Sequence, residues 1–343
     1  MAINKGIVGI GDAGGVVPSD NFTPITYTGN GTTQSTNSLL NQVGSVDFAP
    51  DLVWTKQRNG TAFHMLIDSV RGNTKEIYSN SNASEGTSSN TITSFLNNGY
   101  SIGNNSGLNG VNNTYVSWSW KAGGAAVSNT DGTIGSQVSA NVEAGFSIST
   151  FTSNASTLTV GHGLSSTPDL VIVKATSFSD SWFVNSSALT NQTDRALRLN
   201  QLSAEETNSA FWNNTAPTST TFSLGSGVSV SGQSYVAYCW HSVAGYSKIG
   251  KYTGQSTSAV TVSLDFTPRF VVIKDTSGND YWHVWDTARS PSNNRQEILY
   301  WDLSEAEANS ASNYIQINTN EFVTNTGNLA NINGNVYLYM AIA

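Results

Sequence analysis

The chain repeats one short phrase three times, and this repeat constrains the fold more than any other feature of the sequence. A proline opens a run of mostly apolar residues that ends in lysine, at residues 50–56, 168–174 and 268–274. A second phrase closes each copy and begins with a tyrosine; from Pro50 to Tyr115, Pro168 to Tyr235 and Pro268 to Tyr337 the distance is 65, 67 and 69 residues. Such regular spacing predicts three copies of one unit of roughly 100 residues, the size of a compact domain.

Each unit is predicted to be β-structure. The run after the proline fits a strand buried on both faces, and proline is tolerated at a strand start. The closing phrase Tyr-Val-Ser-Trp-Ser-Trp at residues 115–120 alternates large and small side chains, as in a strand with one buried face. Clusters of Ser, Thr, Asn and Gly recur at roughly the 8–12-residue spacing of short strands joined by turns. We therefore expect an all-β chain of three tandem β-sandwich modules, of jelly-roll or lectin-like type.

One short capped helix is expected in each unit. Residues 203–206 and 304–307 both read Ser-x-x-Glu, and residues 82–85 are a looser version that begins with Asn. A Ser or Asn side chain can cap the first free N–H groups of a helix while the Glu three residues later reaches back to the cap. This interpretation also accounts for the paired acids Glu205/Glu206 and Glu305/Glu307 without glycosidase chemistry.

The repeat sets the expected domain boundaries. They are a Gly-rich N-terminal arm at 1–20, repeat 1 at 21–121, a linker at 122–144, repeat 2 at 145–244 and repeat 3 at 245–343. The linker contains Asp131-Gly132, a good hairpin turn, so residues 127–134 could pair as a small hairpin. Repeats 2 and 3 abut without a linker and are expected to dock rigidly.

Composition excludes several classes of function. Only 11% of the residues are charged and the net charge is −8, while 38% are hydrophobic, so the chain has the apolar surface to fold. The acidic balance and the lack of any Lys/Arg run argue against binding to nucleic acid or to anionic membranes. No apolar stretch is long enough to span a bilayer, and the single cysteine, Cys239, can form no internal disulfide.

Several motifs resemble catalytic or ligand sites, but each has a structural explanation that we favour. Residues 9–14 match Gly-x-Gly-x-x-Gly without the strand and helix that a dinucleotide site needs. His64, Asp68 and Arg71 could form an acid–base group, yet Trp replaces His64 in the other units, so a structural Asp–Arg pair is preferred. The four histidines are scattered, and residues 129–132 fit a turn better than a Ca²⁺ loop. We expect no catalytic residue, no metal site and no cofactor.

Aromatic residues are the remaining candidates for ligand binding. The third unit has more of them than the others, and flat rings with a polar tip suit sugar faces and protein interfaces. Residues alternate between the two faces of a strand, so one set near residue 282 should point away from the core. The candidate binding residues are Tyr281, Trp282, Trp285, Tyr300 and Trp301.

Long phrases of the chain resemble a repeat module of uncharacterised function found in virion and tail-fibre-like structural proteins of marine bacteriophages, particularly cyanophages. The resemblance covers residue 22 to the C-terminus and rests on residues 48–56, 64–72, 94–100, 115–123, 161–174, 211–217 and 337–341. It implies a virion protein with lectin-like sandwich modules. It assigns no functional residue, because the module has no established site.

The sequence and the resemblance together favour a non-catalytic phage virion protein, an adhesin of tail-fibre or baseplate type that contacts a host-surface glycan. The N-terminal arm would join other virion proteins, and a homotrimer is expected. The alternative is a head decoration or capsid fibre protein with a structural or tethering role. A capsule-degrading enzyme is a third and weaker interpretation.

Overall fold

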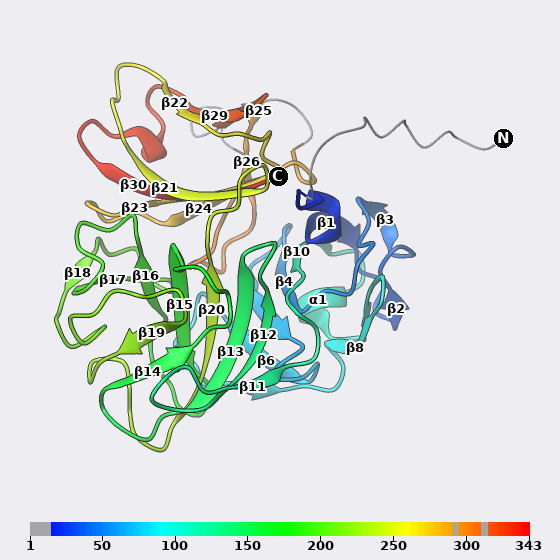
Figure 1. Cartoon of the computed structure of the whole chain (residues 1–343). Helices are drawn as coiled ribbons and strands as arrows, with labels where there is room; N and C mark the ends of the chain where they lie inside the picture. Colours follow the sequence, from blue (N-terminus) through cyan, green and yellow to red (C-terminus); the bar gives the residue numbers. More distant parts are fainter. Residues whose placement is uncertain (1–14, 291–293, 310–314) are drawn as a thin grey trace.

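The computed structural model describes residues 15–290, 294–309 and 315–343, and there the chain consists almost entirely of antiparallel strands (Figure 1). The all-β prediction is confirmed. We call strands β1–β10, β11–β20 and β21–β30 the first, second and third groups. Figure 1 shows these groups, coloured blue to cyan, green, and yellow to red, around a common centre.

The bounds of the elements are as follows. The first group follows the 3-10 helix η1 (Pro18–Asp20) and contains β1 (Phe22–Thr28), β2 (Gln34–Ser35), β3 (Leu40–Val43), β4 (Leu52–Gln57), β5 (Met65–Asp68), β6 (Lys75–Tyr78), β7 (Gly86–Thr87), β8 (Ile92–Leu96), β9 (Gly99–Ile102), α1 (Ser106–Asn109) and β10 (Thr114–Trp120). The second group contains β11 (Val127–Asn129), β12 (Ser136–Asn141), β13 (Phe146–Thr152), β14 (Leu158–Gly161), β15 (Leu170–Ala175), β16 (Phe183–Ser186), β17 (Arg195–Arg198), β18 (Glu206–Thr207), β19 (Thr221–Leu224) and β20 (Ser234–Trp240). The third group contains β21 (Ser247–Thr253), β22 (Val260–Ser263), β23 (Phe270–Asp275), β24 (Trp282–Asp286), β25 (Asn294–Arg295), β26 (Glu297–Tyr300), β27 (Ala308–Asn309), β28 (Ile315–Asn318), β29 (Glu321–Thr324), the 3-10 helix η2 (Leu329–Asn331) and β30 (Val336–Ile342).

Each group pairs one large sheet with one small sheet. The large sheets have the strand orders β3-β1-β10-β4-β5-β6-β7, β11-β12-β13-β20-β15-β16-β17-β18 and β21-β30-β23-β24-β26-β27. The small sheets are β2-β9-β8, β14-β19 and β22-β29-β28-β25. In every large sheet the strand of the closing phrase lies between the opening strand and the strand of the proline phrase, so the two phrases of each repeat are direct neighbours.

The large sheets of all three groups share one hydrophobic core. This common core contains Trp54, Trp118 and Trp120 of the first group, Phe146, Trp182 and Trp240 of the second, and Phe270, Trp282 and Trp301 of the third. Three further clusters each fill the space between the large and small sheets of a single group. The molecule is therefore a ring of three groups around a shared centre.

The closing strands are buried on both faces, which corrects the expectation of one buried face. In β10, Trp118 and Trp120 point into the common core, while Ser117 and Ser119 are also fully buried. Ser117 accepts a hydrogen bond from the Tyr100 hydroxyl at 2.7 Å inside the first group's own core. The alternation of large and small residues therefore distinguishes two buried faces, one toward the common core and one toward the group's own core. The other groups cover the face that a single sandwich would expose to water.

Three equivalent backbone hydrogen bonds close the ring. The N–H groups of Glu85, Glu205 and Glu307, just before β7, β18 and β27, donate to the carbonyls of Thr176, Thr276 and Arg58 at 2.9, 2.8 and 2.7 Å. Each acceptor directly follows the proline-phrase strand of the next group. The third group thus contacts the first as the first contacts the second, although no chain connection joins them there.

The expected capped helices are wrong. Residues 203–207 and 304–309 are extended or strand, and residues 82–85 lead into β7. The helix fails to form because the backbone N–H groups of this segment bond to the next group, and Glu206 and Glu307 form ion pairs with Arg198 and Arg58 instead of reaching back to a cap. The one α-helix among the described residues, α1, starts elsewhere, with the side chain of Asn105 accepting from Gly107 N–H.

The segment expected as a linker takes part in the second large sheet. Strands β11 and β12 pair antiparallel with Asn129 opposite Ser136, so Asp131-Gly132 lies in the turn between them. Strand β12 also pairs with β13 and extends the second sheet. The segment therefore contributes a hairpin to the fold. Residues 1–14 of the expected N-terminal arm lie outside the described residues.

The lysine that ends each proline phrase is buried at a junction between groups. The ammonium of Lys174 donates to the carbonyls of Asn82 and Asp180, and that of Lys274 to the carbonyls of Leu202 and Asp280, so each reaches the preceding group. Lys56 donates to carbonyls of its own group. Burial lowers the pKa of all three lysines to about 8. Backbone carbonyls take the place of the water that would surround an exposed ammonium group, but they offset only part of the cost of burying its charge.

We predict that Trp301→Ala destabilises the protein by about 3–5 kcal/mol, the range for loss of a large buried aromatic. Trp301 is 1% exposed, and its ring stacks on Trp54 of the first group at 4.2 Å between centroids. The control Val111→Ala, at a side chain that is 63% exposed, changes stability by less than about 0.5 kcal/mol. Urea unfolding measures both, and a loss below about 1 kcal/mol for Trp301→Ala would contradict the shared core.

The free energy of unfolding is predicted to rise between pH 8 and 9, below the range in which tyrosines such as Tyr100 and Tyr246, whose pKa burial raises, begin to oppose the rise. In this window the folded chain has released protons from the buried lysines, whose pKa is about 8, while the unfolded chain still holds them. Each lysine contributes a slope of at most about 1.4 kcal/mol per pH unit. Lys274→Met removes one contribution and gives a shallower rise, whereas Lys251→Met on the surface leaves the slope unchanged. Equal slopes for the wild type and Lys274→Met would refute the assignment.

Candidate functional site

The structure separates the aromatic residues expected to bind a ligand. Trp282, Trp285 and Trp301 are at most 1% exposed: Trp282 and Trp301 lie in the common core and Trp285 in the third group's own core. The expectation that one set points to solvent is wrong, because both faces of the third large sheet are covered. Tyr281 and Tyr300 are partly exposed and lie 5.3 Å apart between ring centroids. A binding role for these two tyrosines stays a prediction.

His64, Asp68 and Arg71 do not form an acid–base group. The Nδ1 atom of His64 accepts a hydrogen bond from Trp54 Nε1 at 3.1 Å, and burial lowers the pKa of His64 well below its usual value. Asp68 instead forms an ion pair with Arg71 at 2.6 Å, and both side chains are buried. The structural interpretation of this Asp–Arg pair is confirmed.

The same ion pair joins the first group to the second. Arg71 also donates to Glu85 at 3.0 Å, to the carbonyl of Leu66 at 3.1 Å and to the Tyr238 hydroxyl of β20 at 3.4 Å. Tyr238 donates to Asp68 at 2.7 Å. Burial alone would lower the pKa of Arg71, but Asp68 and its neighbours hold it above its usual value. The guanidinium stays charged in a network that spans the junction.

The other groups modify this network in a consistent way. In the third group, Asp286 pairs with Arg289 at 2.6 Å and accepts from Trp118 Nε1 of the first group at 3.0 Å. In the second group, Ser186 and Leu189 take these places, and Met340 stands at the position of Tyr238 and Trp118. Leu189 and Met340 both belong to the common core. The buried charges thus occur where the neighbouring strand supplies a hydrogen-bond donor, and the uncharged residues Ser186 and Leu189 replace them where it supplies a methionine.

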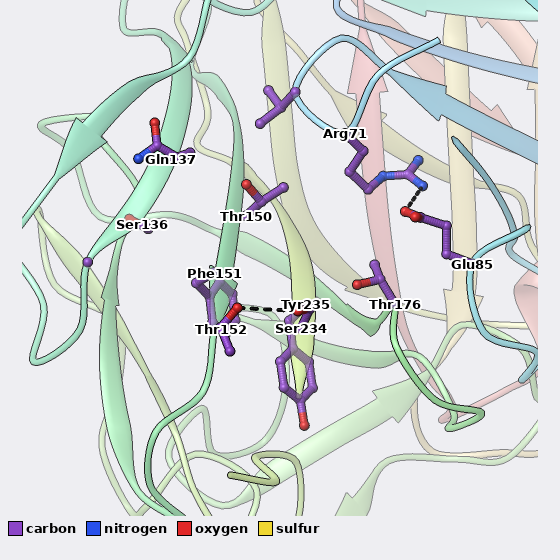
Figure 2. A pocket seen from close by; sticks show the side chains of 12 residues that line it. Arg71, Glu85, Ser136, Gln137, Thr150, Phe151, Thr152, Thr176, Ser234 and Tyr235 are labelled. Atoms are coloured by element: carbon purple, nitrogen blue, oxygen red, sulfur yellow. Dashed lines mark hydrogen bonds and ion pairs between the residues drawn. The ribbon is translucent and has the colours of Figure 1, made fainter. Parts of the chain in front are cut away.

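Next to Arg71, an open groove of about 500 Å³ lies between the first and second groups (Figure 2). Arg71 and Glu85 of the first group form one side, and strands β12, β13 and β20 with the end of β15 form the other. The polar side chains from the second group are Ser136, Gln137, Thr150, Thr152, Thr176 and Ser234. Figure 2 shows these side chains across the groove from Arg71, with the hydrogen bond between Thr152 and Ser234 at 3.2 Å.

This lining suits a polar, uncharged ligand. Hydroxyl and amide side chains both donate and accept hydrogen bonds, and so do the hydroxyl groups of a sugar. The two charged residues of the lining, Arg71 and Glu85, pair with each other, and each has a further partner of opposite charge, Asp68 and Lys75, outside the lining. Its volume lies in the ~300–1,000 Å³ range of small-molecule sites. The groove is therefore the candidate functional site.

Sequence reasoning missed these residues for a physical reason. Thr150, Thr152 and Ser234 have the ordinary composition of a half-exposed strand, and Arg71 and Glu85 come from another repeat. The repeat could have shown only that Arg71 recurs as Arg289 and is absent from the second unit. The groove depends on how the groups meet, which a phrase within one repeat does not specify.

A second depression, of about 710 Å³, lies beside the N-terminal segment. Its lining includes Gly15 and Val16, which directly follow the undescribed residues 1–14, together with Asp51 and Asn141. The Asp51 carboxylate already accepts from the backbone N–H groups of Ala122 and Gly124 at 2.8 and 3.2 Å. The Asp51 carboxylate thus holds the chain that connects the first group to the second. Because its role is structural, we assign the depression no ligand.

Two further features of the described residues bear on ligands and membranes. Across residues 15–290, 294–309 and 315–343, no three His, Cys, Asp or Glu side chains gather as a metal site would require. Over the same ranges, no helix has the length and apolar character needed to cross a membrane. Cys239 is buried in β20, and burial raises the pKa of its thiol.

The network at the first–second junction makes a stability prediction. Arg71→Leu alone should cost about 3–5 kcal/mol, because it leaves the buried Asp68 carboxylate without its cation. Adding Asp68→Ser and Tyr238→Met copies the residues at the equivalent places of the second and third groups, and should recover about half of that loss or more. Urea unfolding of the single and triple variants tests this, and a triple variant less stable than Arg71→Leu would contradict it.

Comparisons with known proteins give a family without an assigned activity. No curated protein matches the chain. Among solved structures, one described as "Life in the extremes: atomic structure of Sulfolobus Turreted Icosahedral Virus" is similar at 10% identity, over 94% of this chain and 79% of that chain. Its TM-score of 0.13 is too low to carry an argument about fold or function. Over residues 17–343, the chain belongs to the family described as Domain of unknown function (DUF7483).

Proposed function

We propose that this chain is a non-catalytic phage virion protein, an adhesin of tail-fibre or baseplate type that binds a host-surface glycan. The observation that carries the glycan part is the groove between the first and second groups. It presents five hydroxyl or amide side chains, those of Gln137, Thr150, Thr152, Thr176 and Ser234, opposite a charge-balanced Arg–Glu pair. The virion part rests on the resemblance of the repeat phrases to modules of phage structural proteins.

The fold is well suited to such a role. A glycan is bound through many weak hydrogen bonds, so the side chains that make them must be held in place before the ligand arrives. In the groove these side chains stand on strands of a large sheet, and Arg71 is fixed by four hydrogen bonds. Several copies on one particle would multiply a weak affinity. The N-terminal arm remains our proposed anchor, and the groove shares no residue with its described part, residues 15–20.

A glycan array tests the binding activity. The full-length chain is expected to bind a subset of defined bacterial surface oligosaccharides, including neutral O-antigen and capsule fragments, with no release of reducing ends. Gln137→Ala combined with Thr152→Ala removes two exposed polar side chains of the groove and should weaken binding at least ~10-fold. The paired control Gln255→Ala and Thr257→Ala, in an exposed loop of the third group, should leave binding unchanged. Absence of binding across the array would refute the glycan proposal, and release of reducing ends would replace it with the capsule-degrading alternative.

Immunogold electron microscopy tests the place on the particle. Gold at the tail or baseplate of intact virions supports the adhesin, and gold spread over the head supports the decoration alternative. Particles without gold would contradict a virion role altogether, whatever the array shows.

A further inference from the structure

The three junctions between groups can be compared position by position, because the registers of their strands match. Thr150 of β13 lies opposite Val236, Thr26 of β1 opposite Val116, and Lys251 of β21 opposite Leu338, so these three residues are equivalent. By the ring-closing hydrogen bonds, Thr176, Arg58 and Thr276 are also equivalent. These two positions decide whether a junction carries an open groove.

At the junction between the third and first groups, an arginine occupies the position that a threonine has in the groove. Arg58 stands where the groove has Thr176, and its guanidinium forms a two-pronged ion pair with Glu307, at 2.7 Å for the shortest contact. Glu307 also binds Arg289 at 3.1 Å. Thr26 is only 5% exposed at this junction, whereas its equivalent Thr150 lines the open groove. At this junction the glutamate equivalent to Glu85 is thus already paired with Arg58, and the threonine equivalent to Thr150 is buried.

At the junction between the second and third groups, the chemistry is different. Leu189 stands in place of Arg71, so the guanidinium is missing. Lys251 stands in place of Thr150 and is exposed, so a long cation takes the place of a short hydroxyl. The fixed donor is missing there, and Lys251 interrupts the hydroxyl surface, of which Thr276 remains as the equivalent of Thr176.

Among the residues that the structure describes, the required groups come together at the first–second junction alone. A guanidinium has five N–H donors, and four bonds of Arg71 go to Asp68, Glu85, the Leu66 carbonyl and the Tyr238 hydroxyl. One N–H on Nη1 is left over in a side chain that lines the groove. The negative charge of Glu85 disfavours an acidic ligand, because it would repel a carboxylate placed beside it. A neutral sugar hydroxyl can accept from Arg71 and donate to Glu85 or to the threonines.

We propose that the chain has one saccharide site, at the first–second junction, although its fold repeats three times, and that this site takes a neutral saccharide. This inference rests on the proposed glycan-binding function and adds its stoichiometry, location and charge preference. Thr150 and Thr176 are the residues that determine it, because the other junctions carry Lys251 and Arg58 at the equivalent places.

Isothermal titration calorimetry of the full chain tests the proposal, with the neutral array oligosaccharide that binds best as the probe. One site per chain is expected. Thr176→Arg supplies Glu85 with the partner that Arg58 gives Glu307, and Thr150→Lys copies Lys251; each should weaken binding at least ~10-fold. The chain already contains these residues at equivalent places, so unchanged melting temperatures are expected. The control Lys251→Thr should leave both stoichiometry and affinity unchanged.

The outcomes separate this inference from the function on which it rests. Binding with three sites per chain, or binding that survives both Thr150→Lys and Thr176→Arg, overturns the single site but keeps a glycan-binding protein. Tighter binding of a uronic-acid analogue of the same length overturns the neutral preference. If no oligosaccharide of the array binds, the proposed glycan binding fails and this site fails with it.

Discussion

The packing of three large sheets against one common core is the interaction on which the rest of the structure depends. It buries the second face of every large sheet, the face that a lone sandwich would leave in water, and so it explains why Trp54, Trp182 and Trp301 are almost inaccessible to solvent. Burying aromatic rings contributes more than any polar contact at these junctions can. It also forces the third group against the first, and the ring closes through the stack of Trp54 on Trp301 and the ion pair of Arg58 with Glu307.

The proline and closing phrases allowed the fold class and the main strands to be predicted, because a run of β-branched and aromatic residues between turn residues has few other solutions. The helices at residues 203–206 and 304–307 could not be excluded from sequence, since a capping box is a local pattern and the hydrogen bonds that override it come from another repeat. The prediction that one set of aromatic residues near residue 282 points to solvent is wrong for the same reason: a period of two shows that two faces differ, but it does not show what covers each face. Sequence reasoning found Arg71 and Asp68 as a structural pair, yet the groove beside them needed the position of the second group.

The three junctions carry different side chains at equivalent positions, and these differences give one junction of the repeated fold a surface of its own. Where Tyr238 or Trp118 supplies a hydrogen-bond donor, the equivalent positions hold an Asp–Arg pair. Where Met340 faces them, these positions hold Ser186 and Leu189. A buried charge without its partners is costly, so these residues change together. The groove lies at the junction where the charged network is present and the place of Arg58 is taken by a threonine. The common core thus fixes the framework, and a few substitutions at its rim determine which junction can bind.

Amide chemical shifts measured by NMR during titration with a neutral oligosaccharide would locate a ligand on the chain without any substitution. If the groove is the saccharide site, the shifts are confined to it, at Gln137, Thr150, Thr152, Thr176 and Ser234, with the equivalent Thr26, Thr28, Lys251 and Thr253 unmoved. Shifts at all three junctions, or shifts centred on Tyr281 and Tyr300 with the groove unchanged, would contradict it.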